Sequence, residues 1–206
     1  MPLLFVGGKN VIMINRINKV EIEYTEEQIF EGEKKSKEDF PELYEYATNV
    51  KEEKGLKAQK LIILIGPHAK EYARNKGLKA KTMNGYFDYE NVETPVILIL
   101  KPSSWRVKST IHHEMTHFDQ YVKKTLVPVS SNKKVDYYLN VSEIEAFENG
   151  LNGFSEKEWW KKFKYNLAYK FDKLYYTRPI LRLVLIIFIV LFLASVELSF
   201  FALLAK

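Results

Sequence analysis

The chain of 206 residues contains no cysteine. This absence excludes a disulfide-stabilised scaffold and any zinc site built from thiolates, so a metal ion would have to be held by His, Asp or Glu. Such ligand sets favour a catalytic over a structural metal site. Hydrophobic residues make up 47% of the chain, which is ample for a core, and the length suits one medium-sized domain with an appended segment.

The chain also lacks a large excess of charge, because its net charge is only +5. The segment 156–182 holds eight Lys and Arg against three acidic residues and accounts for all of that excess. A nucleic-acid-binding protein typically spreads basic residues over a folded face, whereas here they directly precede an apolar run. We therefore expect no nucleic-acid partner. At the N-terminus, Leu3–Val6 has no basic residue before it and is too short for a signal peptide, so we expect a first strand or a short lead-in there.

The pattern His113-Glu114-x-x-His117 stands out in what the chain does contain. On a helix, its two imidazoles lie one turn apart on one face, close enough to bind a single divalent cation. Neutral imidazole is a good zinc ligand, and a catalytic zinc ion takes three protein ligands and keeps one position for water. Glu114, next to the first histidine, is placed to take a proton from that water. The motif therefore predicts a zinc hydrolase with Glu114 as the general base.

Hydrophobic patterning predicts a mixture of strands and helices. Strands are expected at 11–14, 20–24, 60–65, 85–89 and 95–100, the last two as a hairpin beside the motif helix. Helices are expected from a capping box at Thr25–Gln28, from Pro41 to Gly55, over 68–75, through the motif to Lys124, and from a Ser142 cap to Gly150. The polar run 31–39 is expected to be a solvated helix end or a loop. This order favours an α+β domain.

The sequence resembles the zincin metallopeptidases of the gluzincin type. In that family H-E-x-x-H is completed by a Glu on a following helix, often within E-x-x-A, and Glu143-Ile144-Glu145-Ala146 matches this pattern. The resemblance covers roughly 61–150 and implies a zincin-like fold, a Zn²⁺ ion, and Glu143 as third ligand beside His113 and His117. It also implies that a peptide substrate binds as an added strand along the segments at 85–87 and 96–100. The first 60 residues remain unassigned.

One departure from the family pattern leaves a second choice of ligand open. The family usually has Asp or Asn four residues after the ligand Glu, to orient a ligand histidine, and Phe147 stands there. If Glu145 were the ligand, the same offset would fall on Asn149. Asp119 or Glu148 would be other sources of the orienting carboxylate.

Hydrolysis of a peptide bond also needs a group that stabilises the developing oxyanion. Tyr121, Tyr137 and Tyr138 are the tyrosine candidates near the motif and the acidic helix.

The C-terminal part predicts membrane attachment. In 154–178, aromatic and leucine residues recur at helical spacing among lysines, which is typical of an amphipathic helix at an anionic membrane surface or packed on the domain. In 179–206, the run Leu183–Ala205 has Glu197 as its only charge and is long enough to span a bilayer. Basic residues before the run predict a single-pass C-terminal anchor with the folded domain, 1–153, on the cytoplasmic side. Glu197 and the small residues around it favour a homo-oligomer or another membrane partner through this helix.

Together these patterns predict a membrane-anchored zinc metallopeptidase that acts on a peptide or protein substrate next to a lipid bilayer. The alternative is a structural or assembly protein of a membrane-containing particle or envelope complex, which keeps a zincin fold with little or no peptidase activity.

Overall fold

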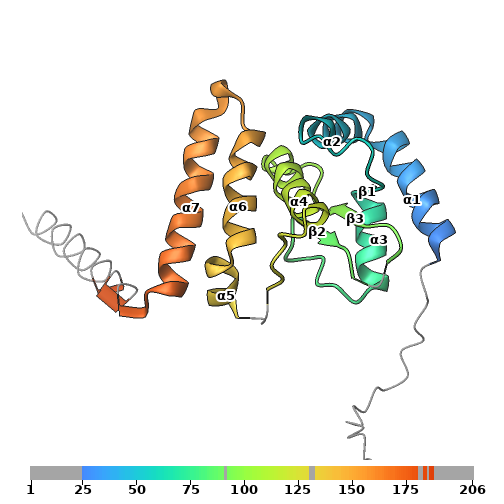
Figure 1. Ribbon diagram of the computed structural model, residues 1–206. Coiled ribbons are helices and arrows are strands. Elements are labelled where there is room, and N and C mark those ends of the chain that lie inside the picture. Colours follow the sequence, from blue (N-terminus) through green and yellow to red (C-terminus); the bar gives the residue numbers. More distant parts are fainter. Residues whose placement is uncertain (1–24, 91, 130–132, 181–182, 185, 188–206) are drawn as a thin grey trace, which may run out of the picture.

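The computed structural model of the chain describes residues 25–90, 92–129, 133–180, 183–184 and 186–187. These residues are mainly helical, with one small sheet (Figure 1). The helices and strands are, in chain order, α1 (Glu26–Asp39), α2 (Pro41–Glu53), β1 (Ile62–Ile65), α3 (Pro67–Asn75), β2 (Gly85–Asp88), β3 (Val96–Ile99), α4 (Val107–Val122), α5 (Lys134–Leu139), α6 (Val141–Gly150), the 3-10 turns η1 (Leu151–Gly153) and η2 (Glu156–Glu158), and α7 (Trp159–Thr177).

The sheet has the strand order β1-β3-β2, with β1 parallel and β2 antiparallel to the central β3. Every side chain of β1 and β3 is buried, which explains their continuous apolar sequences. Side chains of α2 and α4 pack on one face of the sheet, and side chains of α1 and α3 pack on the other. The predicted hairpin of β2 and β3 beside the motif helix is confirmed.

Helix α1 covers the outer edge of β1 with two polar side chains. The N–H groups of Ile63 and Ile65 donate to Glu33 Oε1 and Ser36 Oγ, each at 3.0 Å. Ser36 is fully buried and also donates to the carbonyl of Gly32 at 2.8 Å. The capping box at Thr25 is confirmed, and of the two expectations for 31–39, a solvated helix end or a loop, the helix end is found, since the run is the largely exposed C-terminal part of α1. The polar residues of this run are helical because two of them satisfy a sheet edge that would otherwise be exposed.

Helix α4 lies at the centre, between the sheet and the C-terminal helices (Figure 1). On its second side α6 and η1 pack closely, and Ala146 of α6 is fully buried. Gly153 sits directly against the backbone of Lys108 and Ser109, in the first turn of α4, and leaves no room for a Cβ atom. This backbone contact fixes the start of the motif helix.

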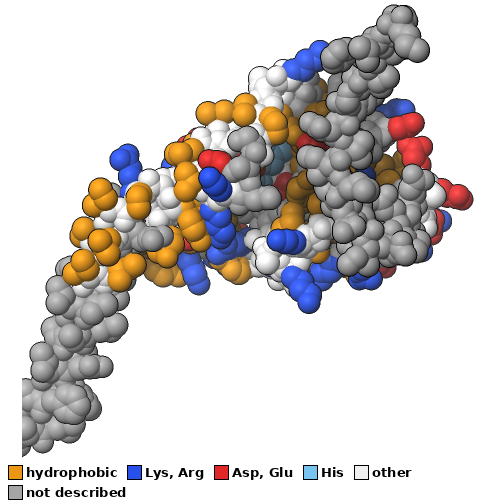
Figure 2. Space-filling model, turned by 90° about the horizontal axis from the view of Figure 1, so that it is seen from below, with side chains coloured by type: hydrophobic (Ala, Val, Ile, Leu, Met, Phe, Trp, Pro, Cys, Tyr) orange, Lys and Arg blue, Asp and Glu red, His pale blue; other side chains and the backbone are white. Residues whose placement is uncertain are grey.

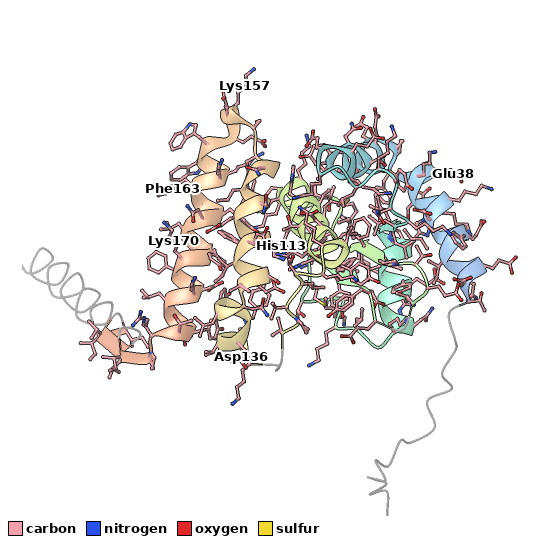
Figure 3. All side chains as sticks on the ribbon, viewed as in Figure 1. Glu38, His113, Asp136, Lys157, Phe163 and Lys170 are labelled. Atoms are coloured by element: carbon pink, nitrogen blue, oxygen red, sulfur yellow. The ribbon has the colours of Figure 1, made fainter. Side chains whose placement is uncertain are left out.

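Helix α7 packs on α5 and α6 through one aromatic face. The ring of Tyr169 stacks on Phe147 with centroids 3.5 Å apart, and Tyr165 stacks on the same ring at 5.0 Å. Its other face is exposed; Phe163 and Lys170 point away from the domain in Figure 3, and Figure 2 shows hydrophobic side chains mixed with lysines on this side. The segment 154–178 is therefore part of the folded domain, because the tyrosines on the inner face of α7 complete the packing of α6.

The predicted fold class needs correction. An α+β zincin-like domain followed by a juxtamembrane helix and a transmembrane helix does not describe this chain, because helices dominate and the described sheet has three strands of four residues each. The strands expected at 11–14 and 20–24 lie outside the described residues.

The predicted single-pass membrane anchor, with the domain on the cytoplasmic side, is also contradicted. None of the described helices is both long enough and apolar enough to cross a bilayer. An apolar run indicates a span only if it forms one long apolar helix, and α7, with 19 residues, carries lysines along its length. Most of the run 183–205, including Glu197, lies outside the described residues.

Candidate metal centre

The two motif histidines lie on the buried middle of α4. The helix spans 16 residues, and apolar side chains at Ile111, Met115 and Phe118 hold one of its faces in the core beneath the sheet. His113 and His117 project from another face, toward α6, and the exposed fraction of their side chains is 14% and 8%. His113 lies at the centre of the molecule in Figure 3. The helix therefore presents two nearly buried imidazoles to the helix that follows.

Helix α6 brings Glu143 to these histidines. Its N-cap is Asn140, whose side-chain oxygen accepts from the N–H groups of Ser142 and Glu143 at 2.8 and 3.3 Å. The predicted cap, Ser142, instead accepts from the N–H of Val127 at 2.8 Å through its hydroxyl. The cap places Glu143 in the first turn of α6, where its carboxylate faces both histidines.

His113, His117 and Glu143 form a cluster that could hold a metal ion, with one ligand atom from each residue and all three atoms within 4.8 Å of one another. The Nε2 atoms of the two histidines are 3.2 Å apart. Oε2 of Glu143 lies 3.4 Å from Nε2 of His113, and Oε1 lies 3.5 Å from Nε2 of His117. The carboxylate thus faces the space between the two imidazoles.

These distances fit a tetrahedral ion with nitrogen and oxygen ligands. Ligand bonds of 2.0–2.2 Å place two ligands of a tetrahedral zinc ion about 3.3–3.5 Å apart. Oε2 of Glu143 is buried and has no close hydrogen bond among the described residues, because Nε2 of His113 is 3.4 Å away; such an oxygen is costly unless a cation neutralises it. The donor set and the unsatisfied oxygen both favour a bound cation.

The charges within the cluster stabilise one another in the metal-free chain. Burial by itself raises the pKa of Glu143, but hydrogen bonds and charge from His113 and His117 outweigh it and lower the pKa to about 2. Burial by itself lowers the pKa of His117, but Glu143 and Glu114 outweigh it and raise that pKa above its ordinary value. The carboxylate is therefore held in its ionised form, as a metal ligand must be.

Glu114 lies between α4 and β2, with only 6% of its surface exposed. Burial raises its pKa, against the opposing charge of His113 and His117. A Cβ atom on Gly85 would come within 2.7 Å of Oε1 of Glu114, so the glycine lets the carboxylate lie directly against the strand. A carboxylate with a raised pKa next to a candidate metal site suits proton transfer.

A cleft of about 710 Å³ opens over the cluster and Glu114. One wall is formed by residues 82–87 with Tyr89 and Glu90, which include β2, and the opposite wall by 126–129 and by residues of α5. Tyr165 reaches the cleft from α7, so the C-terminal helix contributes to its lining. The cleft is large enough for several residues of a peptide.

The outer edge of β2 faces this cleft. The N–H of Leu100 donates to the carbonyl of Asn84 at 2.8 Å. Backbone groups alternate in direction along an antiparallel strand, so the N–H and C=O groups of Tyr86 and Asp88 also point toward β3. The backbone groups of Gly85 and Phe87, which both line the cleft, consequently point away from β3. Because α1 covers the edge of β1, the described sheet offers its free edge on the side of the cluster.

The predicted tyrosines fall into different places. Tyr137 lines the cleft, and burial together with the charge of Glu143 and a hydrogen bond to it raises the pKa of Tyr137 well above its ordinary value. Tyr138 also lines the cleft, but its hydroxyl donates to Asp172 at 3.3 Å. Tyr121 packs on Phe87 and is not part of the lining. Of the three, Tyr137 is the one whose hydroxyl lies beside the cluster.

The structure distinguishes the carboxylates that the sequence left as alternative metal ligands or orienting groups. Glu145, the second choice of metal ligand, accepts a hydrogen bond from Nε2 of Gln120 at 2.8 Å. Asp119 accepts from Lys123 at 2.7 Å, and Glu148 is exposed on α6. Glu143 is the residue that the structure places with the histidines.

Sequence reasoning missed Gln120 and Tyr165, and it named Gly85 only as part of the edge strand, without its contact with Glu114. Gln120 follows His117 by three positions and therefore shares its helix face, a spacing that could have identified it. Gly85 carried a weaker signal, as a glycine at the start of a strand. Nothing in the local sequence marks Tyr165, because it reaches the cleft only through the packing of α7.

No protein-family model, curated protein or solved structure matches this chain.

Proposed function

We propose that this chain is a zinc-dependent peptidase in which His113, His117 and Glu143 hold the metal ion and Glu114 is the general base. The observation that carries this proposal is that the three residues of the cluster line one cleft together with Glu114 and the residues of the edge strand β2. A bound zinc ion would supply an activated water and polarise the carbonyl of the scissile bond.

Residues of the chain would carry out proton transfer and oxyanion stabilisation. Glu114 accepts a proton from the attacking water at its carboxylate and passes it to the leaving amine. Tyr137, with a raised pKa, keeps its proton and serves as a hydrogen-bond donor for the oxyanion. The nearly complete burial of Glu114 strengthens these interactions, because water screens them less.

The free edge of β2 supports a peptide as substrate. The backbone groups of Gly85 and Phe87 can pair with an extended chain added as a fourth strand. Gly85 contacts Glu114, so a peptide paired with this strand lies beside the general base. Tyr86, Tyr89 and Phe87 line the same wall and favour apolar or aromatic side chains in the bound peptide.

The test is cleavage of a peptide library by the full chain with one equivalent of Zn²⁺, followed by mass spectrometry. Glu114→Gln is expected to lower the cleavage rate by about 10²-fold or more, the usual contribution of a general base, while the bound zinc is unchanged. Glu148→Gln, at an exposed position on α6, is the matched control and should cleave like the wild type.

Zinc content separates the ligands from the base. Glu143→Gln should lose the metal ion, whereas Glu148→Gln should keep it, as measured by emission spectrometry after dialysis. Equal cleavage by the wild type and Glu114→Gln would refute the peptidase and leave a structural role for the cluster. A wild-type chain that binds no zinc would refute the metal centre as well.

A further inference from the structure

Gln120 is a buried residue that joins the two helices of the cluster. It is 2% exposed and lies one turn after His117 on α4. Its Oε1 is 3.0 Å from Nδ1 of His117, and its Nε2 donates to the carbonyl of Ser142 at 3.2 Å and to Oε2 of Glu145 at 2.8 Å. A single side chain thus contacts a histidine of the cluster and the residues on both sides of Glu143.

The partners of Gln120 determine how its amide is oriented. A carbonyl and a carboxylate can only accept hydrogen bonds, so the NH₂ group must face Ser142 and Glu145. Oε1 then faces His117, and Nδ1 of that imidazole must carry the hydrogen. In the neutral imidazole, the form that binds a metal ion, Nε2 of His117 then has the lone pair, and this atom lies 3.2 Å from Nε2 of His113 and 3.5 Å from Oε1 of Glu143. Glu145 therefore acts at a distance on the tautomer of His117.

The same contacts fix the distance between α4 and α6. Ser142 immediately precedes Glu143, and Glu145 lies two residues after it, so both anchors of Gln120 flank the carboxylate in the cluster. A shift of α6 along α4 that moved Glu143 away from the histidines would also break the hydrogen bonds of Gln120 to Ser142 and Glu145. The side chain therefore holds the ligand set together before any metal ion arrives.

We infer that Gln120, held by Glu145, is the positioning residue of the metal centre: it selects the tautomer of His117 that can bind a metal and aligns Glu143 with it. This role rests on the proposed zinc site. Partners of ligand histidines typically contribute 10–100-fold to metal affinity. Phe147 stands where the zincin family has the Asp or Asn that orients a ligand histidine. In this chain Glu145 would take that role, acting on His117 through the side chain of Gln120.

The first test compares the zinc affinity of the full chain with that of Gln120→Met, using a competing chromophoric chelator. Affinity should fall by about 10–100-fold in Gln120→Met and stay unchanged in the control Gln59→Met, where the glutamine is exposed. Equal affinity in Gln120→Met and the wild type would overturn the inference. A wild type without zinc affinity would instead refute the proposed function.

The second test reads the tautomer of His117 directly in the metal-free chain, by ¹H–¹⁵N correlation of the imidazole nitrogens at a pH high enough to make the imidazole neutral. The wild type should show Nδ1 protonated, and Gln120→Met should show a mixture of tautomers. A mixture in the wild type would overturn the inference whatever the zinc result.

If Gln120→Met fails to fold, the inference can be tested by exchanging the residue types at positions 120 and 145. Gln120→Glu places two carboxylates side by side and should weaken zinc binding. Adding Glu145→Gln restores an amide–carboxylate bond while the residue at 120 still accepts from His117, but the donor to the carbonyl of Ser142 stays absent, so the double variant should recover part of the lost affinity. A double variant no better than Gln120→Glu would refute the role of the pair.

Discussion

The contact between Gly85 and Glu114 gives a quantitative prediction for Gly85→Ala. A Cβ atom at position 85 would lie 2.5 Å from Cγ2 of Thr110 and 2.7 Å from Oε1 of Glu114, whereas ordinary contacts begin at 3.4 Å. The methyl group of Thr110 cannot rotate away cheaply, because its hydroxyl donates to the carbonyl of Arg106 at 3.1 Å. The substitution must therefore move β2 or displace the carboxylate by roughly 1 Å.

Two effects of different size follow from this displacement. Overpacking of this kind costs about 1–3 kcal/mol in the free energy of unfolding, which corresponds to a fall in Tm of roughly 2–4 °C per kcal/mol for a chain of this length. Moving a catalytic group by about 1 Å costs on the order of 10²-fold in rate. Zinc affinity should hold, because the contacts with the added methyl group involve none of the three ligands.

The assay measures Tm, bound zinc and kcat/KM in Gly85→Ala and in Gly85→Ala/Thr110→Ser. The serine removes Cγ2 but keeps the hydroxyl, so the double variant relieves the contact with Thr110 and leaves the one with Glu114. Tm should recover in part, and cleavage should stay low. A Gly85→Ala variant with wild-type Tm and wild-type kcat/KM would show that Glu114 does not depend on the close approach of the strand.

Three further predictions concern the edge of the sheet, the start of α4 and the charge of Glu114. Ser36→Ala leaves the buried N–H of Ile65 without its acceptor and should cost about 1–3 kcal/mol in urea unfolding, whereas the exposed control Ser103→Ala should lie within about 0.5 kcal/mol of the wild type. Gly153→Ala forces the first turn of α4 away from η1, so Tm and zinc affinity should fall together; a loss of Tm with unchanged affinity would show that the cluster tolerates this shift. Because burial raises the pKa of Glu114, the metal-free folded state binds that proton more tightly than the unfolded state and loses stability as the pH rises above the ordinary value of 4.5. Glu114→Gln removes this loss, so its Tm advantage over the wild type should grow from pH 4.5 to pH 7, and a constant difference would contradict the raised pKa.

The local pattern was enough to predict several elements. The capping box at Thr25, the start of α2 at Pro41 and the apolar strands of the sheet follow from interactions within a few residues, and all are found. The hairpin of β2 and β3 is also found, since the two strands lie close in sequence. Local hydrogen bonding and side-chain periodicity act over such short distances that the sequence expresses them directly.

In the candidate site, some residues follow from local sequence and others depend on tertiary packing. The spacing of His113, Glu114 and His117 places them on one buried helix, as expected. The choice between Glu143 and Glu145 depends on the rotation of α6 against α4, which the close packing of Ala146 and the Asn140 cap decide. Residues two positions apart on a helix face different directions, so that rotation puts one carboxylate at the histidines and the other at Gln120.

The sequence left alternatives open where tertiary packing sets the outcome. The polar run 31–39 folds as a helix because Glu33 and Ser36 bind the edge of β1, and the segment 154–178 belongs to the folded body because Tyr165 and Tyr169 pack on α6. The sequence by itself determined the motif helix, its two imidazoles and the neighbouring glutamate, since one helical turn relates them. The tertiary structure alone decided the carboxylate of the cluster, the partner of His117 and the free edge of β2, because each depends on groups brought together from distant parts of the chain.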